Sequence, residues 1–406
     1  MCKITRGANF PEAASRIVKA VPYYVLALAM GIPALLVGVE LPFWLTLYRQ
    51  NLAWHSDLRV YYTPAYMVRT GQASSIYDFT ALKTNEDAVV ARDGGAVPFL
   101  HPAYEVLLFV PLSFLSYRTA YVVSALVNLC VLATISWLLF PLTPDLRSLG
   151  PNWLPPALLL GFMPIAFTIF AGQDSLLLLL SLVLAYRVMP NHEAAAGVLF
   201  SLGMFRFQVL LPIVILFVLW RSLRFVVAWI TGSAVLLTIS AAITGWSAQV
   251  QYFKVLNAMA KVSFWLMIER MPNLRALFLA FDLGAVPLAF SCLSILLLIF
   301  VLGKEQSARR KLLLGISVSA LVTYYLFMHD VSVLALPILV ALNESVRARD
   351  WLRTALVSVT LCGFAIFWFS PTRLYLGVLF SMLFFITEVL DLFRRSNLTA
   401  HKEALL

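Results

Sequence analysis

The sequence predicts an all-α, polytopic membrane protein whose residues 1–406 form a single integral membrane domain. Hydrophobic residues make up 61% of the chain and charged residues only 12%, whereas a soluble domain carries about 25% charged residues. The mean hydropathy is +0.88. At about 20 residues for each span, the apolar runs divide the chain into about twelve transmembrane helices, some of them short or broken.

The first part of the chain combines one span with a long polar loop. Its N-terminus is basic, and the positive-inside rule therefore places it in the cytoplasm. The first span covers about residues 21–48. Residues 49–118 follow without a span, and because long loops translocate regardless of their charge, we place this loop outside. Within it, residues 104–115 are apolar but too short to cross, which favours an interfacial or re-entrant segment.

The remaining apolar segments complete the expected set of spans. They lie at about residues 119–140, 153–171, 175–189, 194–205, 208–220, 222–243, 284–303, 311–328, 331–346, 353–370 and 373–393. The four segments between 153 and 220 are short, and they can also be counted as two long broken helices. Residues 244–283 form a second external segment of amphipathic character, suited to the membrane surface. Both termini are then inside.

Charge and cysteine usage exclude several classes of site. The net charge of +10 does not indicate a nucleic-acid partner, because basic cytoplasmic loops and contacts with anionic membrane lipids account for it. The four cysteines, at positions 2, 130, 292 and 362, are scattered singly and form neither a metal-binding pattern nor a disulfide framework. The run DLR at 57–59 lacks the second acid of a DxD metal site, and the sequence has no Walker loop, HExxH or GxGxxG motif, so we expect no metal and no cofactor.

Residues 55–78 are the polar stretch richest in groups that can do chemistry. Asp57 follows the first span on the external side, where a carboxylate could take a proton from an acceptor hydroxyl. His55, Arg59 and Tyr62 lie beside it in the sequence and could bind substrate. The alternative is an interfacial Asp57 paired with Arg59, since surface ion pairs are common. Glu40 is a second acid, within the first span, and equally fits a structural hydrogen bond.

Two polar breaks interrupt the short apolar segments. One contains Gln173 and Asp174, and the other contains Arg206 and Gln208. A charged group at membrane depth costs about 2.5–3.5 kcal/mol on insertion scales and needs a partner. Either Asp174 and Arg206 pair with each other, or Arg206 meets a substrate phosphate, for which its planar fork is suited.

Further polar residues stand between later apolar segments. His329 and Asp330 occupy a short turn, where the histidine could donate to a phosphate or cap a helix. His101 and Glu105 add a histidine and an acid to the long loop. Asn273 and Arg275 stand at a helix start and could serve an anion or a cap.

With these residues in view, the chain resembles the family-87 glycosyltransferases of the GT-C superfamily. The resemblance is carried by Asp57, Tyr62, Ala65, Gly71, the run IYD at 76–78, HP at 101–102, GQDS at 172–175, AG at 196–197, FRFQ at 205–208, MPNLRALF at 271–278 and HD at 329–330. The family tends to have Lys-Pro-Gln where this chain has residues 206–208, so Arg206 stands in for the lysine. It usually shows Tyr-x-Pro near His101.

The resemblance implies a GT-C fold and a polyprenyl-phosphate-mannose-dependent α-mannosyltransferase type of activity. The donor would be a polyprenyl-phosphate sugar and the acceptor a lipid or glycan hydroxyl, reached on the external side of the inner (plasma) membrane. Asp57 would be the general base of an inverting transfer. The residues expected to hold the donor phosphate are Arg206, His329 and Arg275. The residues expected to bind substrate are His55, Arg59, Tyr62, His101, Glu105, Gln173, Asp174, Gln208, Asn273 and Asp330.

Two other classes share part of this pattern. A lipid transporter or flippase would also have broken helices and buried charges, but it predicts paired half-repeats, which the sequence does not display. A lipid-linked glycan ligase tends to carry its large loop late in the chain, whereas this loop follows the first span.

Overall fold

The computed structural model describes residues 56–91, 97–149, 152–261, 270–366 and 375–403, together with isolated positions between 38 and 49. Those residues form helices and no strand, which confirms the all-α prediction. The predicted first span lies mostly outside the described residues, as do Glu40 and His55.

The described part of the loop predicted to be external folds into short helices. They are α2 (Arg59–Arg69), α3 (Phe79–Val89) and a run of η3 (Ala103–Glu105), α4 (Val106–Phe109) and η4 (Val110–Phe114). Helix α3 begins after Asp78, because the carboxylate of Asp78 accepts hydrogen bonds from the backbone N–H groups of Thr80 (2.8 Å) and Ala81 (3.0 Å) and satisfies two free donors at the helix start.

Five helices among the described residues are long and apolar enough to cross a membrane. They are Tyr117–Leu142 (α5, Tyr117–Leu139, with η5, Phe140–Leu142), Glu193–Leu219 (α10, Glu193–Ser201; η6, Leu202–Arg206; α11, Phe207–Leu219), α12 (Leu223–Thr244), α15 (Ala285–Gly303) and Asp330–Ala348 (η8, Asp330–Leu334; α17, Ala335–Ala348). The pair α7 (Leu154–Leu160) and α8 (Met163–Ala171), bent by 59°, would make a sixth. The chain is therefore a membrane protein with five or six candidate spans in its described part, and the expected twelve are not reached there.

Several predicted spans differ from the observed helices for a clear physical reason. The segments expected at 194–205 and 208–220 form one continuous run, because a 3-10 stretch ending at Arg206 joins them. Helix α9 (Ser175–Val188) has 14 residues, about 21 Å at 1.5 Å per residue, which is shorter than the roughly 30 Å hydrocarbon layer. The other helices that match predicted spans are α16 (Ala308–Val322), α18 (Trp351–Ile366) and α19 (Gly377–Glu403).

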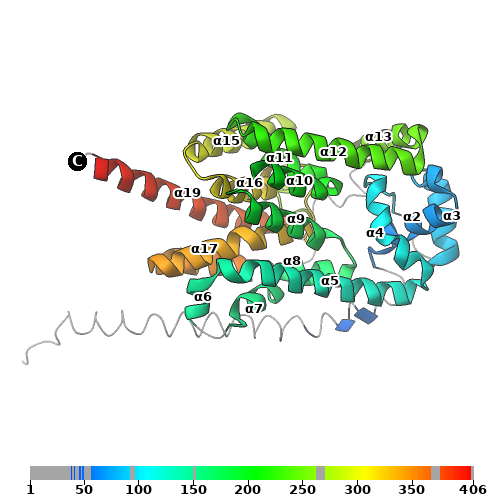
Figure 1. Ribbon diagram of the computed structural model, residues 1–406, viewed down its shortest axis with the longest axis horizontal. Coiled ribbons are helices and arrows are strands. Elements are labelled where there is room, and N and C mark those ends of the chain that lie inside the picture. The colour runs from blue at the N-terminus through cyan, green and yellow to red at the C-terminus, as the bar shows by residue number, and fades with distance from the viewer. Residues whose placement is uncertain are drawn as a thin grey trace, which may run out of the picture.

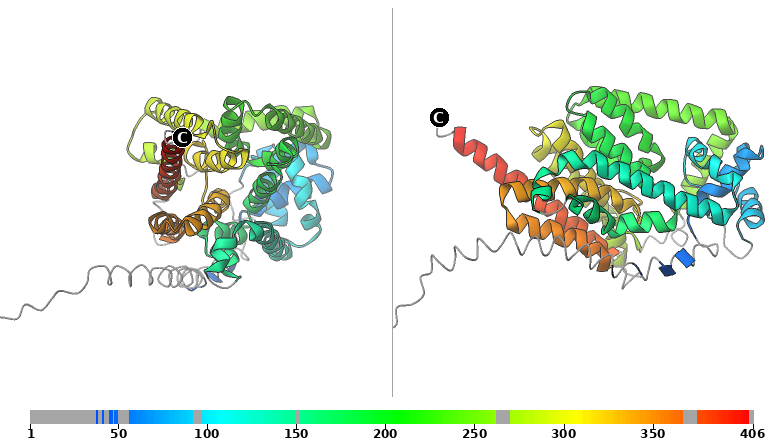
Figure 2. Two further views of the ribbon diagram at one scale, coloured as in Figure 1. Left: turned by 60° about the vertical axis from the view of Figure 1, so that its left-hand side comes forward. Right: turned by 60° about the horizontal axis from the view of Figure 1, so that its bottom comes forward.

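The two predicted external segments lie at the same end of the bundle. Figure 1 shows α2, α3 and α4 beside the end of α13 (Trp246–Lys261), while α6 (Pro144–Ser148), α17 and the C-terminal end of α19 lie at the opposite end. The views in Figure 2 agree with this arrangement. The two segments meet where the rings of Tyr77 and Tyr252 lie 5.0 Å apart. The loop also contacts α12, because the Tyr104 N–H donates to Ser240 Oγ at 3.0 Å.

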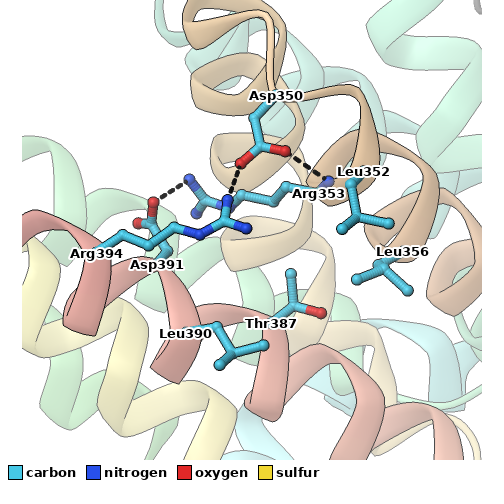
Figure 3. A pocket seen from close by; sticks show the side chains of 8 residues that line it. All are labelled: Asp350, Leu352, Arg353, Leu356, Thr387, Leu390, Asp391 and Arg394. Atoms are coloured by element: carbon cyan, nitrogen blue, oxygen red, sulfur yellow. Dashed lines mark hydrogen bonds and ion pairs between the residues drawn. The ribbon is translucent and has the colours of Figure 1, made fainter.

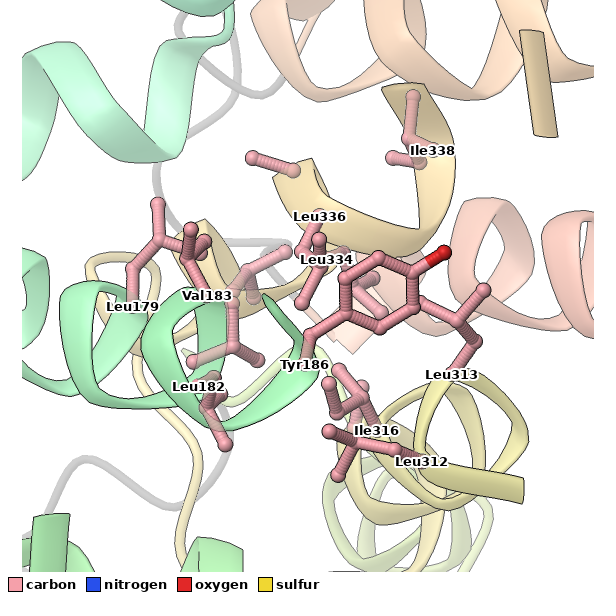
Figure 4. Packing of buried hydrophobic residues seen from close by; sticks show 14 of the residues in the cluster. Leu179, Leu182, Val183, Tyr186, Leu312, Leu313, Ile316, Leu334, Leu336 and Ile338 are labelled. Carbon is pink, nitrogen blue, oxygen red and sulfur yellow. The ribbon is translucent and has the colours of Figure 1, made fainter. Parts of the chain in front are cut away.

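Leucine-rich helix α9 lies in the main core. Figure 4 shows its side chains, including Leu182 and Tyr186, packed against Leu312 and Ile316 of α16 and residues of η8 and α17. A helix surrounded by protein on all sides is apolar all round, which explains the leucine run without lipid contact. The loop has its own smaller core, built around Tyr61, Tyr77 and Tyr117.

Small residues let α10 approach α12 closely. A Cβ on Gly197 would lie 2.3 Å from the Phe225 carbonyl oxygen, and one on Gly232 would lie 2.2 Å from Ser201 Oγ. Close helix crossings in membranes depend on such small side chains. This crossing fixes α10, and with it the 3-10 segment that carries Arg206.

Candidate functional site

Asp57 lies just before α2 and faces the break between α8 and α9. Its Oδ2 accepts a hydrogen bond of 2.8 Å from Gln173 Nε2, across 116 positions of sequence. The residue is half-buried, whereas its neighbours Ser56 and Leu58 are buried. The carboxylate therefore has one fixed partner and remains open to the surroundings.

Gly172 allows the loop and the break to meet. It ends α8 with a left-handed backbone (φ 73°), a conformation that costs other residues energy. A Cβ at this position would lie 2.9 Å from Leu58 Cβ and 3.4 Å from Leu58 N. Because Leu58 follows Asp57 and Gln173 follows Gly172, this close approach brings the two side chains into hydrogen-bonding distance.

Gln173 links Asp57 to a buried guanidinium. The Arg206 Nη2 group donates to Gln173 Oε1 at 2.8 Å and to Asp174 Oδ1 at 2.5 Å. Tyr61 joins the same group of atoms, since its hydroxyl donates to Gln173 Oε1 at 2.6 Å and accepts from Arg206 at 3.0 Å. The amide of Gln173 thus accepts on one side from Arg206 and Tyr61 and donates on the other to Asp57.

Asp330 balances Arg206 from the opposite side. Its Oδ1 lies 3.5 Å from Arg206 Nε and accepts from Ser175 Oγ at 3.1 Å. Its Oδ2 accepts from the Phe327 N–H at 3.0 Å. The predicted pairing of Asp174 with Arg206 is therefore observed, and Asp330 is a second counter-ion.

His329 is buried beside this network with both ring nitrogens unsatisfied. Its ring stacks with those of Phe167 (6.4 Å between centroids) and Phe327 (5.7 Å). Neither Nδ1 nor Nε2 has a hydrogen-bond partner among the described residues; the nearest acid oxygen is Asp330 Oδ2, 3.6 Å from Nε2. Burial lowers the pKa of His329, so the ring is neutral near pH 7 and has one nitrogen free to donate.

His101 and Glu105 complete the cluster at its loop side. His101 Nδ1 lies 2.7 Å from Glu105 Oε2 and 3.9 Å from Asp174 Oδ2. Burial, assisted by Arg206, lowers the pKa of His101 to about 3. Burial, followed by the neighbouring Asp174, raises the pKa of Glu105 well above its usual range.

His101, Glu105 and Asp174 are of residue types that bind metal ions, and their ligand atoms lie within 4.8 Å of one another. However, two ligands of one ion at the usual 2.0–2.1 Å are separated by about 3.0–3.4 Å. The 2.7 Å between His101 Nδ1 and Glu105 Oε2 is shorter and is a hydrogen-bond distance. The arrangement therefore fits a hydrogen-bonded group better than an ion site.

The remaining predicted residues have other neighbours. Arg59 lies 3.6 Å from Glu86, so the alternative pairing of Asp57 with Arg59 is replaced by a link to α3. The Tyr62 hydroxyl donates to the Leu115 carbonyl at 2.7 Å and packs the loop. Gln208 is half-buried, and its carbonyl accepts from Thr323 Oγ1 at 2.6 Å.

Asn273 and Arg275 lie at the start of α14 (Leu274–Ala280). Asn273 Oδ1 accepts from the Ala276 N–H at 3.1 Å, and its amide donates to the Thr323 carbonyl at 2.9 Å, so Asn273 is a buried cap. The Arg275 guanidinium lies 3.6 Å over the ring of Tyr324, and its Nη1 donates to the Tyr324 carbonyl at 3.2 Å.

The structure also brings in residues that the sequence did not single out as site residues. Tyr61 lies at the centre of the network, and Asn128 of α5 donates to the Gln173 carbonyl at 3.1 Å. A polar residue within an apolar span is itself a signal of function or of a buried contact, and Asn128 fits that description.

Comparison with protein families identifies one match. The model described as Glycosyltransferase family 87 matches residues 99–329, more than half of the 406 residues. The matched region contains Gln173, Asp174, Arg206 and His329, whereas Asp57 precedes it. Comparisons with the curated proteins and with the solved structures gave no match.

Proposed function

The chain belongs to glycosyltransferase family 87, and from this membership we propose that it moves a sugar from a polyprenyl-phosphate donor to a lipid or glycan hydroxyl. The family indicates glycosyltransferase activity and hence a donor and an acceptor. The finer assignments are ours: mannose as the sugar, the external side of the inner membrane as the place, a GT-C type of fold, and inversion at the anomeric carbon.

The observation that supports this mechanism is the hydrogen-bonded chain from Asp57 through Gln173 to Arg206. The half-buried carboxylate of Asp57 takes the proton of the acceptor hydroxyl. The acceptor oxygen forms a bond to the anomeric carbon while the bond from that carbon to the phosphate oxygen breaks. The bonding electron pair leaves with polyprenyl phosphate, and preorganised donors stabilise the charge that develops there.

His329 is the group with the most unused hydrogen-bonding capacity for that phosphate. Arg206 already donates to three oxygen atoms and lies between two carboxylates, so much of its charge is balanced. The two nitrogens of His329 have no partner among the described residues, and a buried donor left unsatisfied costs free energy. A phosphate oxygen accepting from His329 removes that cost. Arg275 is a second candidate for the phosphate.

The arrangement of the ends supports an external active site. The loop that carries Asp57 and the α13 segment share one end of the bundle, while α6 and the end of α17, with Arg147 and Arg347, lie at the other. Positive residues concentrate in cytoplasmic loops, so the basic end is assigned to the cytoplasm.

A transfer assay with purified protein in nanodiscs tests the proposal. The donor is radiolabelled polyprenyl-phosphate mannose, the acceptor a lipid extract, and the variants are Asp57→Asn and the control Asp78→Asn. Asn caps a helix about as well as Asp, so the control changes the same group in the same loop without removing the cap of α3. We expect Asp57→Asn to lose about 10²–10⁴-fold in rate and the control to stay near wild type, with and without chelator.

Three results would count against the proposal. An Asp57→Asn variant as active as the control would remove Asp57 as the base. Loss of wild-type activity in chelator would mean that a metal takes part. A wild type that transfers no sugar from this donor, but does from another polyprenyl-phosphate sugar, would correct the assignment of mannose alone.

A further inference from the structure

The proposed transfer gives no role to Glu105, a buried titratable group beside the site. Glu105 is fully buried, at 0% exposure, at the junction of η3 and α4. It touches neither Asp57 nor His329 in the hydrogen bonds and ion pairs of the described residues, but it adjoins Asp174, the counter-ion of Arg206. Its protonation state therefore affects the charge around Arg206.

The acceptor atoms in this group outnumber the donors. Both oxygens of Glu105, Oδ2 of Asp174 and Nδ1 of His101 are buried and have no hydrogen-bond partner among the described residues. Buried polar atoms are almost always paired. Two carboxylates in contact cannot pair unless one of them carries a proton, so a proton is missing from the simplest description of the group.

One added proton supplies the donor that the two adjacent acids lack. A neutral His101 protonated on Nδ1 donates to Glu105 Oε2, which lies 2.7 Å away. A protonated Glu105 can donate to the adjacent carboxylate of Asp174. Asp174 Oδ1 accepts from Arg206 Nη2. Every hydrogen bond in the chain from His101 through Glu105 to Asp174 then runs in the same direction.

The balance of charge around Arg206 also favours a protonated Glu105. Asp174 and Asp330 already face Arg206, so an ionised Glu105 would be a third buried negative charge against one guanidinium. A donor phosphate would bring a further negative charge to the site. The burial of Glu105 and its neighbour Asp174 both raise its pKa, and His101, with its pKa lowered to about 3, does not compete for the proton.

We propose that Glu105 is a positioning residue that stays uncharged and, by hydrogen-bonding to Asp174, holds Arg206 in place without adding negative charge to the phosphate site. This inference rests on the proposed function for its effect on activity, but not for the state of Glu105 itself. What matters at this position is that the side chain is uncharged and can donate a hydrogen bond to Asp174.

The test compares Glu105→Gln, Glu105→Asp and Glu105→Ala, with Glu193→Gln as a control outside the site. In Glu105→Gln the amide can accept from His101 and donate to Asp174. We therefore expect its transfer rate to stay within about threefold of wild type and its melting temperature to stay near that of wild type. The Ala variant leaves a charged partner without its hydrogen bond, and we expect at least about a tenfold loss in rate. The Asp variant is too short to reach both partners and should be less active than the Gln variant.

Two measurements do not depend on activity. The infrared spectrum of the wild type should contain the carbonyl band of a buried, protonated carboxylic acid that is absent from Glu105→Gln and present in Glu193→Gln. Metal analysis of the purified protein should show no ion whose content falls in Glu105→Gln.

The inference is overturned if the carbonyl band is the same in both Gln variants, or if a stoichiometric ion disappears with Glu105→Gln. A Gln variant as impaired as the Ala variant, or an Asp variant that is fully active while the Gln variant is not, overturns the positioning role. A wild type inactive with every donor refutes the proposed function instead, and the infrared and metal results still decide the state of Glu105.

Discussion

Replacing Gly172 by alanine should damage the proposed site from outside it. Gly172 has φ 73°, and an L-residue in the left-handed region costs about 1–2 kcal/mol. The new Cβ would lie 2.9 Å from Leu58 Cβ and within 3.5 Å of two Leu58 backbone atoms. Since carbon atoms normally approach to about 3.5–4.0 Å, the start of α2 must move away by roughly 0.6–1 Å.

That movement acts directly on the hydrogen bond between Asp57 Oδ2 and Gln173 Nε2, which is 2.8 Å long. A misplacement of about 1 Å in a catalytic arrangement can cost about 10²-fold in rate, so we expect Gly172→Ala to reduce kcat/KM by about 10–100-fold. The assay is transfer from polyprenyl-phosphate mannose in nanodiscs, with thermal unfolding measured on the same preparations.

The chain offers a matched control in Gly71. It also has a positive φ, 83°, but no atom lies within 4 Å of a Cβ placed there. Gly71→Ala therefore incurs the backbone strain without the collision. A third variant, Gly172→Asn, keeps the collision but relieves part of the strain, since Asn tolerates the left-handed region. We expect it to be about as inactive as Gly172→Ala and more stable. Equal activity of Gly172→Ala and Gly71→Ala would refute the link between this close approach and Asp57.

Three further predictions concern the phosphate site, the pH dependence and the opposite end of the bundle. His329→Gln should lower kcat/KM by about 10–100-fold, because hydrogen bonds to charged groups contribute about 1.5–3 kcal/mol. The control His192→Gln changes an exposed histidine and should have no effect. Equal rates in the two variants would exclude His329 as a hydrogen-bond donor to the phosphate. Burial raises the pKa of Glu86 to about 7 against the attraction of Arg59, so protonated Glu86 stabilises the folded state. This stabilisation is about 1–2 kcal/mol after a discount for solvent screening, and it is lost as the pH rises from about 4.5 through 7. The melting temperature of Glu86→Gln should therefore fall less over that pH range than the melting temperature of wild type. At the opposite end of the bundle (Figure 3), Arg353 is buried against Glu388 (2.7 Å) and Asp391 (3.0 Å), whereas the side chain of Arg394 is 61% exposed beside Asp350. In detergent unfolding, Arg353→Ala should lower the free energy of unfolding by about 3–5 kcal/mol and Arg394→Ala by at most about 1 kcal/mol. Similar losses in the two variants would contradict the argument from burial.

The sequence predicted where helices lie better than it predicted which of them cross the membrane. Hydropathy measures how apolar a segment is, and it does not tell whether lipid or protein surrounds it. In the most apolar 18 residues of each helix, 6% are buried within the protein in α15 but 83% in the helix Asp330–Ala348, although both were expected as equivalent spans. Helix α9 is apolar because α5, α10 and α17 surround it, and nothing local in its leucine run distinguishes that case.

The candidate site was predicted residue by residue, but not as a network. Polar residues in apolar surroundings stand out, so Gln173, Asp174, Arg206 and His329 could be named from the sequence. Their partners depend on contacts between distant segments, and the bond from Gln173 to Asp57 spans 116 positions. Local reasoning offered only the neighbour in sequence, Arg59, as an alternative partner for Asp57, and the actual partner of Arg59 is Glu86. Asn273 similarly has the local role of a cap.

The network connects the place where negative charge would disappear during transfer to the place where it would appear. In the proposed transfer, Asp57 would take the acceptor proton and lose its own charge, and at the same step the leaving phosphate would change from a diester with one charge to a monoester whose second pKa is about 6. The total charge of the site is unchanged. Gln173 and Arg206 lie along the hydrogen-bonded chain that begins at Asp57, and they stay in place because Tyr61, Asp174 and Asp330 hold the guanidinium. A fixed cation beside a moving negative charge stabilises the later state without having to reorient, and for this reason we propose that the two carboxylates that hold Arg206 assist the reaction by keeping it in place.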